Sequence, residues 1–243
     1  MNDSLLLVGH GSISEKAAEK VLMGYREHVA LHTRYKVVEV GAILGEPSLD
    51  NVVRKLHGCV TVLPVLMCNR HLAGDKLREI LDQDRKLEEQ VSFDILAPVG
   101  EAAQFIKTLE DIVEEAVARS DFDHKNTIVN LVAHGSKRRP ASRLMTKHLE
   151  AELVTRDRYQ QISSSFLEEA PYFDDVAEKI KIPTVSIGLF VGGGTHALKD
   201  IMRVMNAFPN KNHFYGGTVG DFPGFKDLLV EVAATVAVAV KGR

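Results

Sequence analysis

An internal repeat restricts the folds open to this chain more than any other feature of its sequence. The segment Val8-Gly9-His10-Gly11-Ser12 corresponds to Val132-Ala133-His134-Gly135-Ser136 in the second half. The interval from this histidine to a later proline is 37 residues in both halves, from His10 to Pro47 and from His134 to Pro171. A duplicated unit therefore accounts for the chain better than one continuous domain.

A second histidine extends the repeat. His71 follows His10 by 61 residues, and His196 follows His134 by 62. Each begins the pattern His-x-x-x-Asp, which ends at Asp75 in the first half and at Asp200 in the second. Chance readily produces one such match, but hardly all of them in register.

Short runs rich in Leu, Val and Ile alternate with longer helical patterns throughout, which favours parallel sheets covered by helices on both faces. We predict two similar α/β lobes, residues 1–122 and 123–243, each with a four-stranded parallel sheet. The predicted strands are 5–9, 36–44, 59–67, 92–96, 127–133, 161–167, 184–191 and 212–215. The predicted helices are 14–32, 49–56, 71–81, 102–119, 141–156, 173–180, 196–207 and 223–240.

Composition excludes several classes of protein. Of 243 residues, 45% are hydrophobic and 26% charged, as in ordinary globular domains. A net charge of −3 argues against a nucleic-acid partner. We expect Cys59 and Cys68 to be buried thiols in a cytoplasmic protein. The apolar run 228–240 is too short to cross a membrane, so we interpret it as a packed terminal helix.

The four repeated histidines fall after predicted strands, at the edge where open parallel sheets bind ligands. Neutral imidazole is a common ligand for divalent transition metals and also accepts a proton near neutral pH. A lone histidine in such a turn more often caps a helix. Because the pair recurs in both halves, we favour a metal or proton-transfer site at His134 and His196, with an equivalent pair at His10 and His71.

Glycines and cations near the second pair suggest how a ligand is held. Gly192-Gly193-Gly194 leaves room for a flat ring beside the backbone, although a plain flexible loop is the alternative. Lys137, Arg138 and Arg139 stand before a predicted helix and suit an anion rich in carboxylates. A solvated charge run would explain those three cations equally well.

The second half has an acidic residue that the first half lacks. Glu168 follows the apolar strand of the second half in the sequence Phe166-Leu167-Glu168-Glu169. Ile43-Leu44-Gly45-Glu46 stands at the same place in the first half, which we interpret as a shortened turn without that acid. Glu168 is either a carboxylate for the histidine site or an acid at a helix N-terminus.

Together, His-Gly-Ser, Phe-Leu-Glu and Gly-x-His-x-x-x-Asp resemble the class II tetrapyrrole chelatases, most closely the sirohydrochlorin cobaltochelatase and ferrochelatase group, over nearly the whole chain as two tandem units. The resemblance implies insertion of Co²⁺ or Fe²⁺ into a soluble tetrapyrrole, on the path to cobalamin or siroheme. It also implies that the metal is a substrate, with no permanently bound cofactor and no membrane partner.

Carried over by motif, the resemblance implies that His134 and His196 face the metal with Glu168 as the acid, while His10 and His71 hold the matching places. Lys137, Arg138, Arg139, Gly193 and Gly194 would then contact the tetrapyrrole. The first half departs from the pattern, because it lacks the acid and the glycines before His71. We therefore assign the working site to the second half, although Glu46 could replace the missing acid in the first.

Two alternatives remain open from sequence. A non-catalytic tetrapyrrole or metal carrier would share the fold, and a two-lobed small-ligand binding protein would use the histidines only as caps. A hydrolase is disfavoured because no Gly-x-Ser-x-Gly motif occurs. We expect a monomer or a homodimer.

Overall fold

The structure is a computed structural model that describes residues 4–13, 16–68, 71–87, 91–191 and 195–239. For residues 71–73, 84–87, 195–197 and 236–239 the structure describes the backbone and not the side chains. The chain divides into two compact units. The first contains Met1–Phe105 and Phe225–Arg243, and the second contains Ile106–Val191 and Thr195–Gly224.

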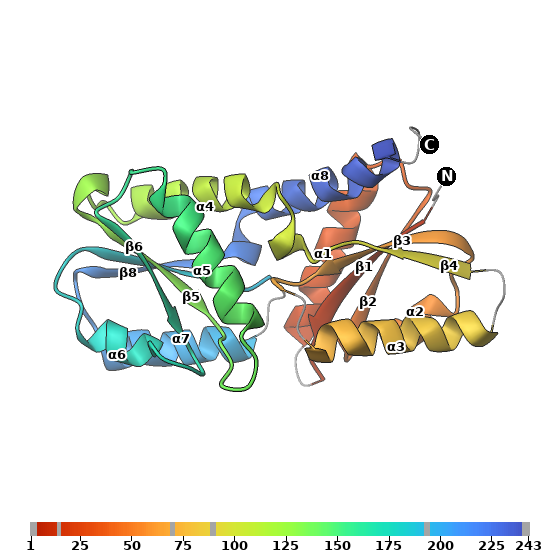
Figure 1. The fold of residues 1–243 in the computed structure, drawn as a ribbon, viewed down its shortest axis with the longest axis horizontal. Coiled ribbons are helices and arrows are strands. Elements are labelled where there is room, and N and C mark those ends of the chain that lie inside the picture. The colour runs from red at the N-terminus through yellow and green to blue at the C-terminus, as the bar shows by residue number, and fades with distance from the viewer. Residues whose placement is uncertain (1–3, 14–15, 69–70, 88–90, 192–194, 240–243) are drawn as a thin grey trace. The chain divides into compact units, whose positions relative to one another are not determined.

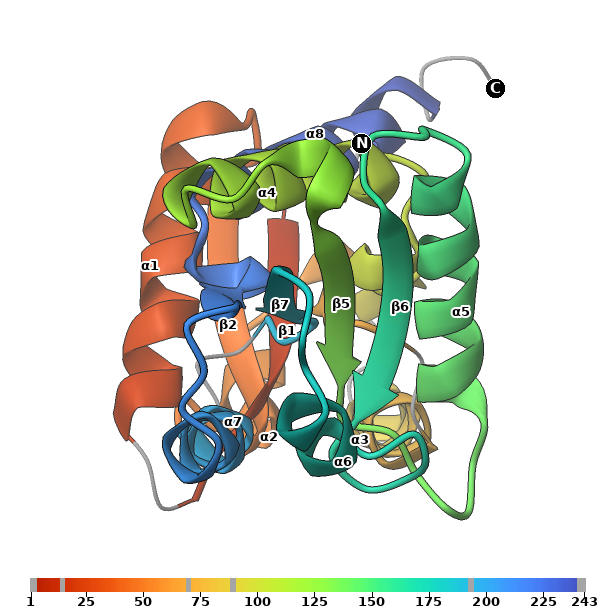
Figure 2. The same cartoon turned by 90° about the vertical axis from the view of Figure 1, so that its left-hand side faces the viewer.

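The first unit is built on a parallel sheet in the order β2-β1-β3-β4. In Figure 1, α2 and α3 lie below this sheet and α8 lies above it, and Figure 2 shows α1 beside the edge strand β2. The elements before residue 105 are β1 (Ser4–Gly11), α1 (Lys16–His32), β2 (Val37–Leu44), α2 (Leu49–Val53), β3 (Gly58–Val65), α3 (His71–Leu87), β4 (Val91–Ile95) and the short 3₁₀ helix η1 (Val99–Glu101).

The second unit repeats this sheet in the order β6-β5-β7-β8, again all parallel. Figure 1 places α6 and α7 below its sheet and α4 above, and Figure 2 shows α5 beside the edge strand β6. Its elements are α4 (Phe105–Arg119), η2 (His124–Asn126), β5 (Ile128–Ala133), α5 (Ala141–Val154), β6 (Gln161–Phe166), α6 (Phe173–Glu178), β7 (Thr184–Gly188), α7 (Thr195–Ala207), β8 (His213–Thr218) and η3 (Val219–Asp221). The last helix, α8 (Pro223–Ala239), returns to the first unit.

Apolar residues fill both faces of the central strand β1 because helices cover both sides of its sheet. Leu5, Leu6, Leu7 and Val8 are consecutive in β1, and none exposes any surface to solvent. Successive strand side chains point to opposite faces, so only a sheet covered on both faces buries all four. The predicted α/β class, with two four-stranded parallel sheets and helices on both faces, is confirmed.

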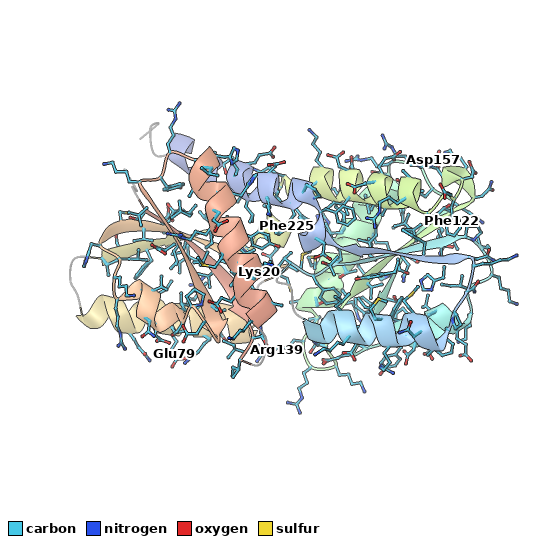
Figure 3. The ribbon with its side chains drawn as sticks, turned by 180° about the vertical axis from the view of Figure 1, so that it is seen from behind. Lys20, Glu79, Phe122, Arg139, Asp157 and Phe225 are labelled. Carbon is cyan, nitrogen blue, oxygen red and sulfur yellow. The ribbon has the colours of Figure 1, made fainter. Side chains whose placement is uncertain are left out.

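The last helix of each repeat packs in the other repeat's unit. Helix α8 joins the first unit, where the ring of Phe225, which is labelled in Figure 3, lies 5.5 Å from the Tyr25 ring of α1. Helix α4 joins the second, where Ala116 packs against Gly216 and the Arg119 guanidinium donates a hydrogen bond to the Gly216 carbonyl over 3.2 Å. The boundaries 1–122 and 123–243 stay a prediction for the repeat along the chain. The compact units in space differ from them, because α4 belongs to the second unit and α8 to the first.

Element boundaries agree with the sequence to within a few residues, with some differences. Helix α3 continues to Leu87, beyond the predicted end at residue 81, and β7 ends at Gly188 rather than 191. Of the two thiols expected to be buried, Cys68 is buried but Cys59 is exposed, because β3 begins at the sheet margin. No helix within the described ranges is long and apolar enough to cross a membrane.

Candidate functional site at the strand ends

The sheet order brings the two histidine-bearing segments of each unit to neighbouring strand ends. Strands β5 and β7 are adjacent; His134 directly follows β5, and His196 is the second residue of α7, which follows β7. In the first unit β1 and β3 are adjacent; His10 is the penultimate residue of β1, and His71 is the first residue of α3. Because strand order reverses at this point of the sheet, its carboxyl edge is the expected ligand site.

Glu168 lies next to His134. Its Oε2 atom is 3.5 Å from His134 Nδ1, and both side chains are partly exposed. The backbone fixes this approach, since the Glu168 N–H donates to the His134 carbonyl over 2.9 Å. Glu168 also stands five residues before α6, which begins at Phe173. The alternative interpretation of Glu168 as a helix N-terminal acid is therefore wrong.

The imidazole of His134 has a defined orientation. Its Nδ1 atom lies 3.2 Å from the Gly135 carbonyl oxygen, at hydrogen-bonding distance. A proton donated from Nδ1 leaves an unprotonated lone pair on Nε2, which is the form of imidazole that binds metals. His10 makes the same contact with the Gly11 carbonyl, also at 3.2 Å. The two units therefore hold their first histidine in the same way.

Glycine is required after each of these histidines. Gly11 and Gly135 adopt φ values of +72° and +73°, in the left-handed region. A Cβ on Gly135 would also lie 2.7 Å from Glu169 Cγ, and a Cβ on Gly11 would lie 2.0 Å from the Leu44 carbonyl oxygen. The His-Gly sequence thus lets the histidine turn pack directly against the turn that follows the neighbouring strand.

The three cations predicted to hold an anion are exposed on the segment before α5. Lys137 Nζ lies 5.8 Å from the centre of the Tyr172 ring, at a cation–π distance. Arg138 donates its backbone N–H to Ser136 Oγ over 3.3 Å, and Arg139 is exposed before Pro140, which precedes the first residue of α5. All three positions suit an anionic ligand, and their role stays a prediction.

Several predicted site residues fall outside the described set. Gly192, Gly193 and Gly194 lie outside the described residues, and the backbones of His71 and His196 are described without their side chains. Among the side chains that are described, no three His, Cys, Asp or Glu residues gather closely enough to hold a metal ion. Metal binding by the two histidine pairs therefore stays a prediction.

The first unit has no acid at the place of Glu168. Leu44 follows His10 by 34 residues, as Glu168 follows His134. The bridges between Ala42 and Ser48 and between Phe166 and Tyr172 fix the same register. The predicted shortened turn is therefore wrong, because both turns have the same length and Leu44 replaces the acid. Glu46 instead accepts a hydrogen bond from the Ser48 N–H over 2.8 Å before α2.

One histidine of the second unit is structural. His213 begins β8, at the amino end of its strand, and is 7% exposed. Its Nε2 atom is 2.8 Å from Ser186 Oγ, and within the described part of the chain Nδ1 has no hydrogen-bond partner. Burial penalises the charged imidazolium and lowers the pKa of His213 to about 4. This residue therefore does not belong to the site at the carboxyl edge.

Solved structures of known proteins have the same fold as this chain. The chain superposes on SirB from Bacillus subtilis with Fe³⁺ at a TM-score of 0.80 and 19% identity, covering 100% of this chain and 98% of that one. A structure described as CbiX, the terminal enzyme for biosynthesis of siroheme in denitrifying bacteria, gives 0.79 and 17%, covering 96% and 98%. The sirohydrochlorin chelatase SirB of Bacillus subtilis subspecies spizizenii, in complex with cobalt, gives 0.77 and 16%, covering 100% and 98%.

A search of curated proteins gives no match. The CbiX family model, in contrast, matches the sequence twice, over residues 4–116 and 128–236. The two matched segments are the two halves of the repeat, and together they cover most of the chain. The chain belongs to the CbiX family, with two tandem copies of the family unit.

Proposed function

We propose that this protein is a metal chelatase that inserts Co²⁺ or Fe²⁺ into sirohydrochlorin or a related soluble tetrapyrrole, on a route to cobalamin or siroheme. Membership of the CbiX family and the names of the similar structures support the reaction class. The observation that carries the proposal is the pair His134 and Glu168, 3.5 Å apart at the carboxyl edge of the second sheet.

Metal insertion into a tetrapyrrole needs a group that binds the ion and groups that accept protons, and His134 with Glu168 can supply both. A divalent ion enters the ring as two pyrrole N–H protons leave, so a catalyst assists by binding the ion or by accepting protons. In the proposal, His134 Nε2 and His196 bind the incoming ion or accept a proton. Glu168, partly exposed beside His134, accepts the second proton and passes it to solvent. The metal is a substrate and leaves in the product.

Charge supports a substrate of this class. Lys137, Arg138 and Arg139 are exposed on the turn that carries His134. The peripheral carboxylates of sirohydrochlorin are anions that such cations bind. Gly193 and Gly194 would leave space for the macrocycle beside His196. These five substrate contacts belong to the proposal, and His10 with His71 would form a second metal-binding pair without a neighbouring acid.

The test is anaerobic insertion into sirohydrochlorin, followed by absorbance, with Co²⁺, Fe²⁺ and Ni²⁺ compared against protein-free controls. His134→Ala, His196→Ala and Glu168→Gln should each lower the protein-dependent rate about 100-fold or more, the scale of general acid–base and positioning effects. His10→Ala and His71→Ala are the matched controls and should act far more weakly.

Each alternative has its own outcome. Stoichiometric binding of sirohydrochlorin without acceleration would identify a carrier and overturn the enzymatic proposal. Wild-type rates in the His134→Ala and His196→Ala proteins, with loss in His10→Ala, would move the site to the first unit. A protein that neither binds sirohydrochlorin nor changes in thermal stability with Co²⁺ would fit the small-ligand binding alternative.

A further inference from the structure

A buried carboxylate lies directly behind the exposed acid of the site. Glu168 has a partly exposed side chain, whereas the next residue, Glu169, is 6% exposed. Burying a carboxylate is unfavourable unless partners replace its water. Glu169 has such partners, so its burial is a built feature of the second unit.

The two oxygens of Glu169 reach two different elements. Oε1 accepts a hydrogen bond from the Ser136 N–H over 2.9 Å, on the turn that carries His134. Oε2 accepts a hydrogen bond from Arg143, on α5, and the pair is also an ion pair. Arg143 donates a further hydrogen bond to the Ala170 carbonyl over 3.1 Å. The carboxylate thus ties the turn after β5, the turn after β6 and the first part of α5 to one another.

Neighbouring residues complete this connection. Gly135 leaves the space that Glu169 fills, since a Cβ there would lie 3.0 Å from Glu169 Oε1. The Gly135 N–H donates to the Oγ atom of Ser142, a buried α5 residue, over 3.3 Å. His134 is therefore followed by two consecutive backbone N–H groups, and each has a side-chain acceptor.

The first unit forms the same turns without the side chains of Glu169, Arg143 and Ser142. By the register of the repeat, Gly45 stands in place of Glu169, Glu19 in place of Arg143 and Ala18 in place of Ser142. Its turns pack directly, because a Cβ on Gly45 would lie 2.2 Å from the Ser12 carbonyl oxygen. The fold of the turn therefore does not need the ion pair. The pair occurs in the unit that also has an acid beside its histidine.

We infer that Glu169 and Arg143 are positioning residues that hold Glu168 beside His134, and so set the proton-transfer geometry of the proposed metal insertion. This inference rests on the proposed function. Neither residue touches substrate; each acts through the two turns that carry the reacting side chains. A displacement of about 1 Å in such a pair lowers a rate by up to about 100-fold while substrate binding is retained.

The experiment is a double-mutant cycle on anaerobic Co²⁺ insertion into sirohydrochlorin, with Glu169→Gln, Glu168→Gln and the double variant. Glu169→Gln should lower kcat about 10- to 100-fold and leave KM within about two-fold. In the Glu168→Gln background the same substitution should have almost no further effect, because its target is already absent. Lys147→Gln, which removes the α5 ion pair with Glu150, is the matched control and should keep the wild-type kcat.

A purely structural role predicts a different result. The two effects on kcat would then multiply, or Glu169→Gln would lower thermal stability with an unchanged kcat, and either outcome overturns the inference. If Glu169→Gln does not fold, Arg143→Lys and Arg143→Gln replace it, with kcat expected to be higher in the lysine variant. Equal kcat values in these two variants and the wild type would also overturn it. Failure of the proposed function is distinct, since the wild-type protein would then not accelerate insertion.

Discussion

Leu44 in the first unit occupies the position that Glu168 occupies in the second. Each follows the His-Gly-Ser histidine of its half by 34 residues, and Leu44 is 41% exposed where an acid would stand. A second apolar residue replaces a charged one nearby: Ile13 matches Lys137 in register and is 83% exposed. The two units thus have the same backbone conformation at these turns and the same histidine contact, but they differ in the charged groups beside that histidine.

Restoring the acid should give the first unit chelatase activity. In a His134→Ala background, Leu44→Glu is expected to raise the anaerobic rate of Co²⁺ insertion into sirohydrochlorin about 10-fold or more, because a proton acceptor then stands beside His10. Leu44→Gln is the matched control and should give no increase. Equal rates for the glutamate and glutamine variants would show that the missing acid does not explain the difference between the units.

Gly135→Ala should lower the stability of the protein. The left-handed φ of +73° costs about 1–3 kcal/mol for a residue with a side chain, and the new Cβ would meet Glu169 and Phe166 at 2.7 and 2.8 Å. Urea denaturation should show a loss of about 2 kcal/mol or more in the free energy of unfolding. Gly224→Ala is the control, because nothing lies within 4 Å of its Cβ. Equal stability of the two variants would contradict the close packing seen at Gly135.

Burial of His213 makes stability depend on pH. Its pKa is about 4 in the folded protein and 6.5 in the unfolded chain, so between these values only the unfolded chain binds the proton. The contribution is complete above about pH 6.5 and is lost as pH falls to about 4, by about 3 kcal/mol in total. The measurement is the free energy of unfolding in urea at several pH values, for wild type and His213→Gln. If both proteins lose the same free energy over this interval, His213 is not the cause.

Periodicity and the repeat were enough to predict the fold. Strand–helix alternation and matched intervals fixed the number of strands, their parallel direction and the edge that carries His134 and His196, because these depend on local pattern and on general rules of sheet connection. The exchange of α4 and α8 was not predicted. Both helices are apolar enough to pack on either sheet, and no local signal distinguishes the two choices.

The site was predicted less completely. Glu168 is predicted because it closely follows an apolar strand, and the same reasoning ranks Glu169, one residue further from the strand, below it. Only the structure shows that one is partly exposed beside His134 and the other is buried against Arg143. The register of the repeat contains a signal for Glu169. Gly45 is the corresponding residue of the first half, and a large charged residue at a position where the other copy has glycine is expected to have a partner of its own.

The exchanged helices predict how the chain behaves when it is cut. A fragment of residues 1–122 keeps β1–β4 but lacks α8, whose buried Phe225, Leu228 and Leu229 belong to the first unit. It also carries α4, whose buried residues pack in the second unit. Neither this fragment nor residues 123–243 should unfold cooperatively in urea alone, because each leaves a helix-sized apolar surface in water.

Two further measurements complete that test. Mixing the fragments should restore a cooperative transition and give one complex by size-exclusion chromatography. A chimera of residues 1–104 joined through a Gly/Ser linker to 225–243 contains the helix that the first unit uses, and it should unfold cooperatively by itself. A cooperative transition for the 1–122 fragment alone, with a melting temperature matching that of the chimera, would contradict the exchange. It would show instead that α4 covers the first sheet as well as α8 does.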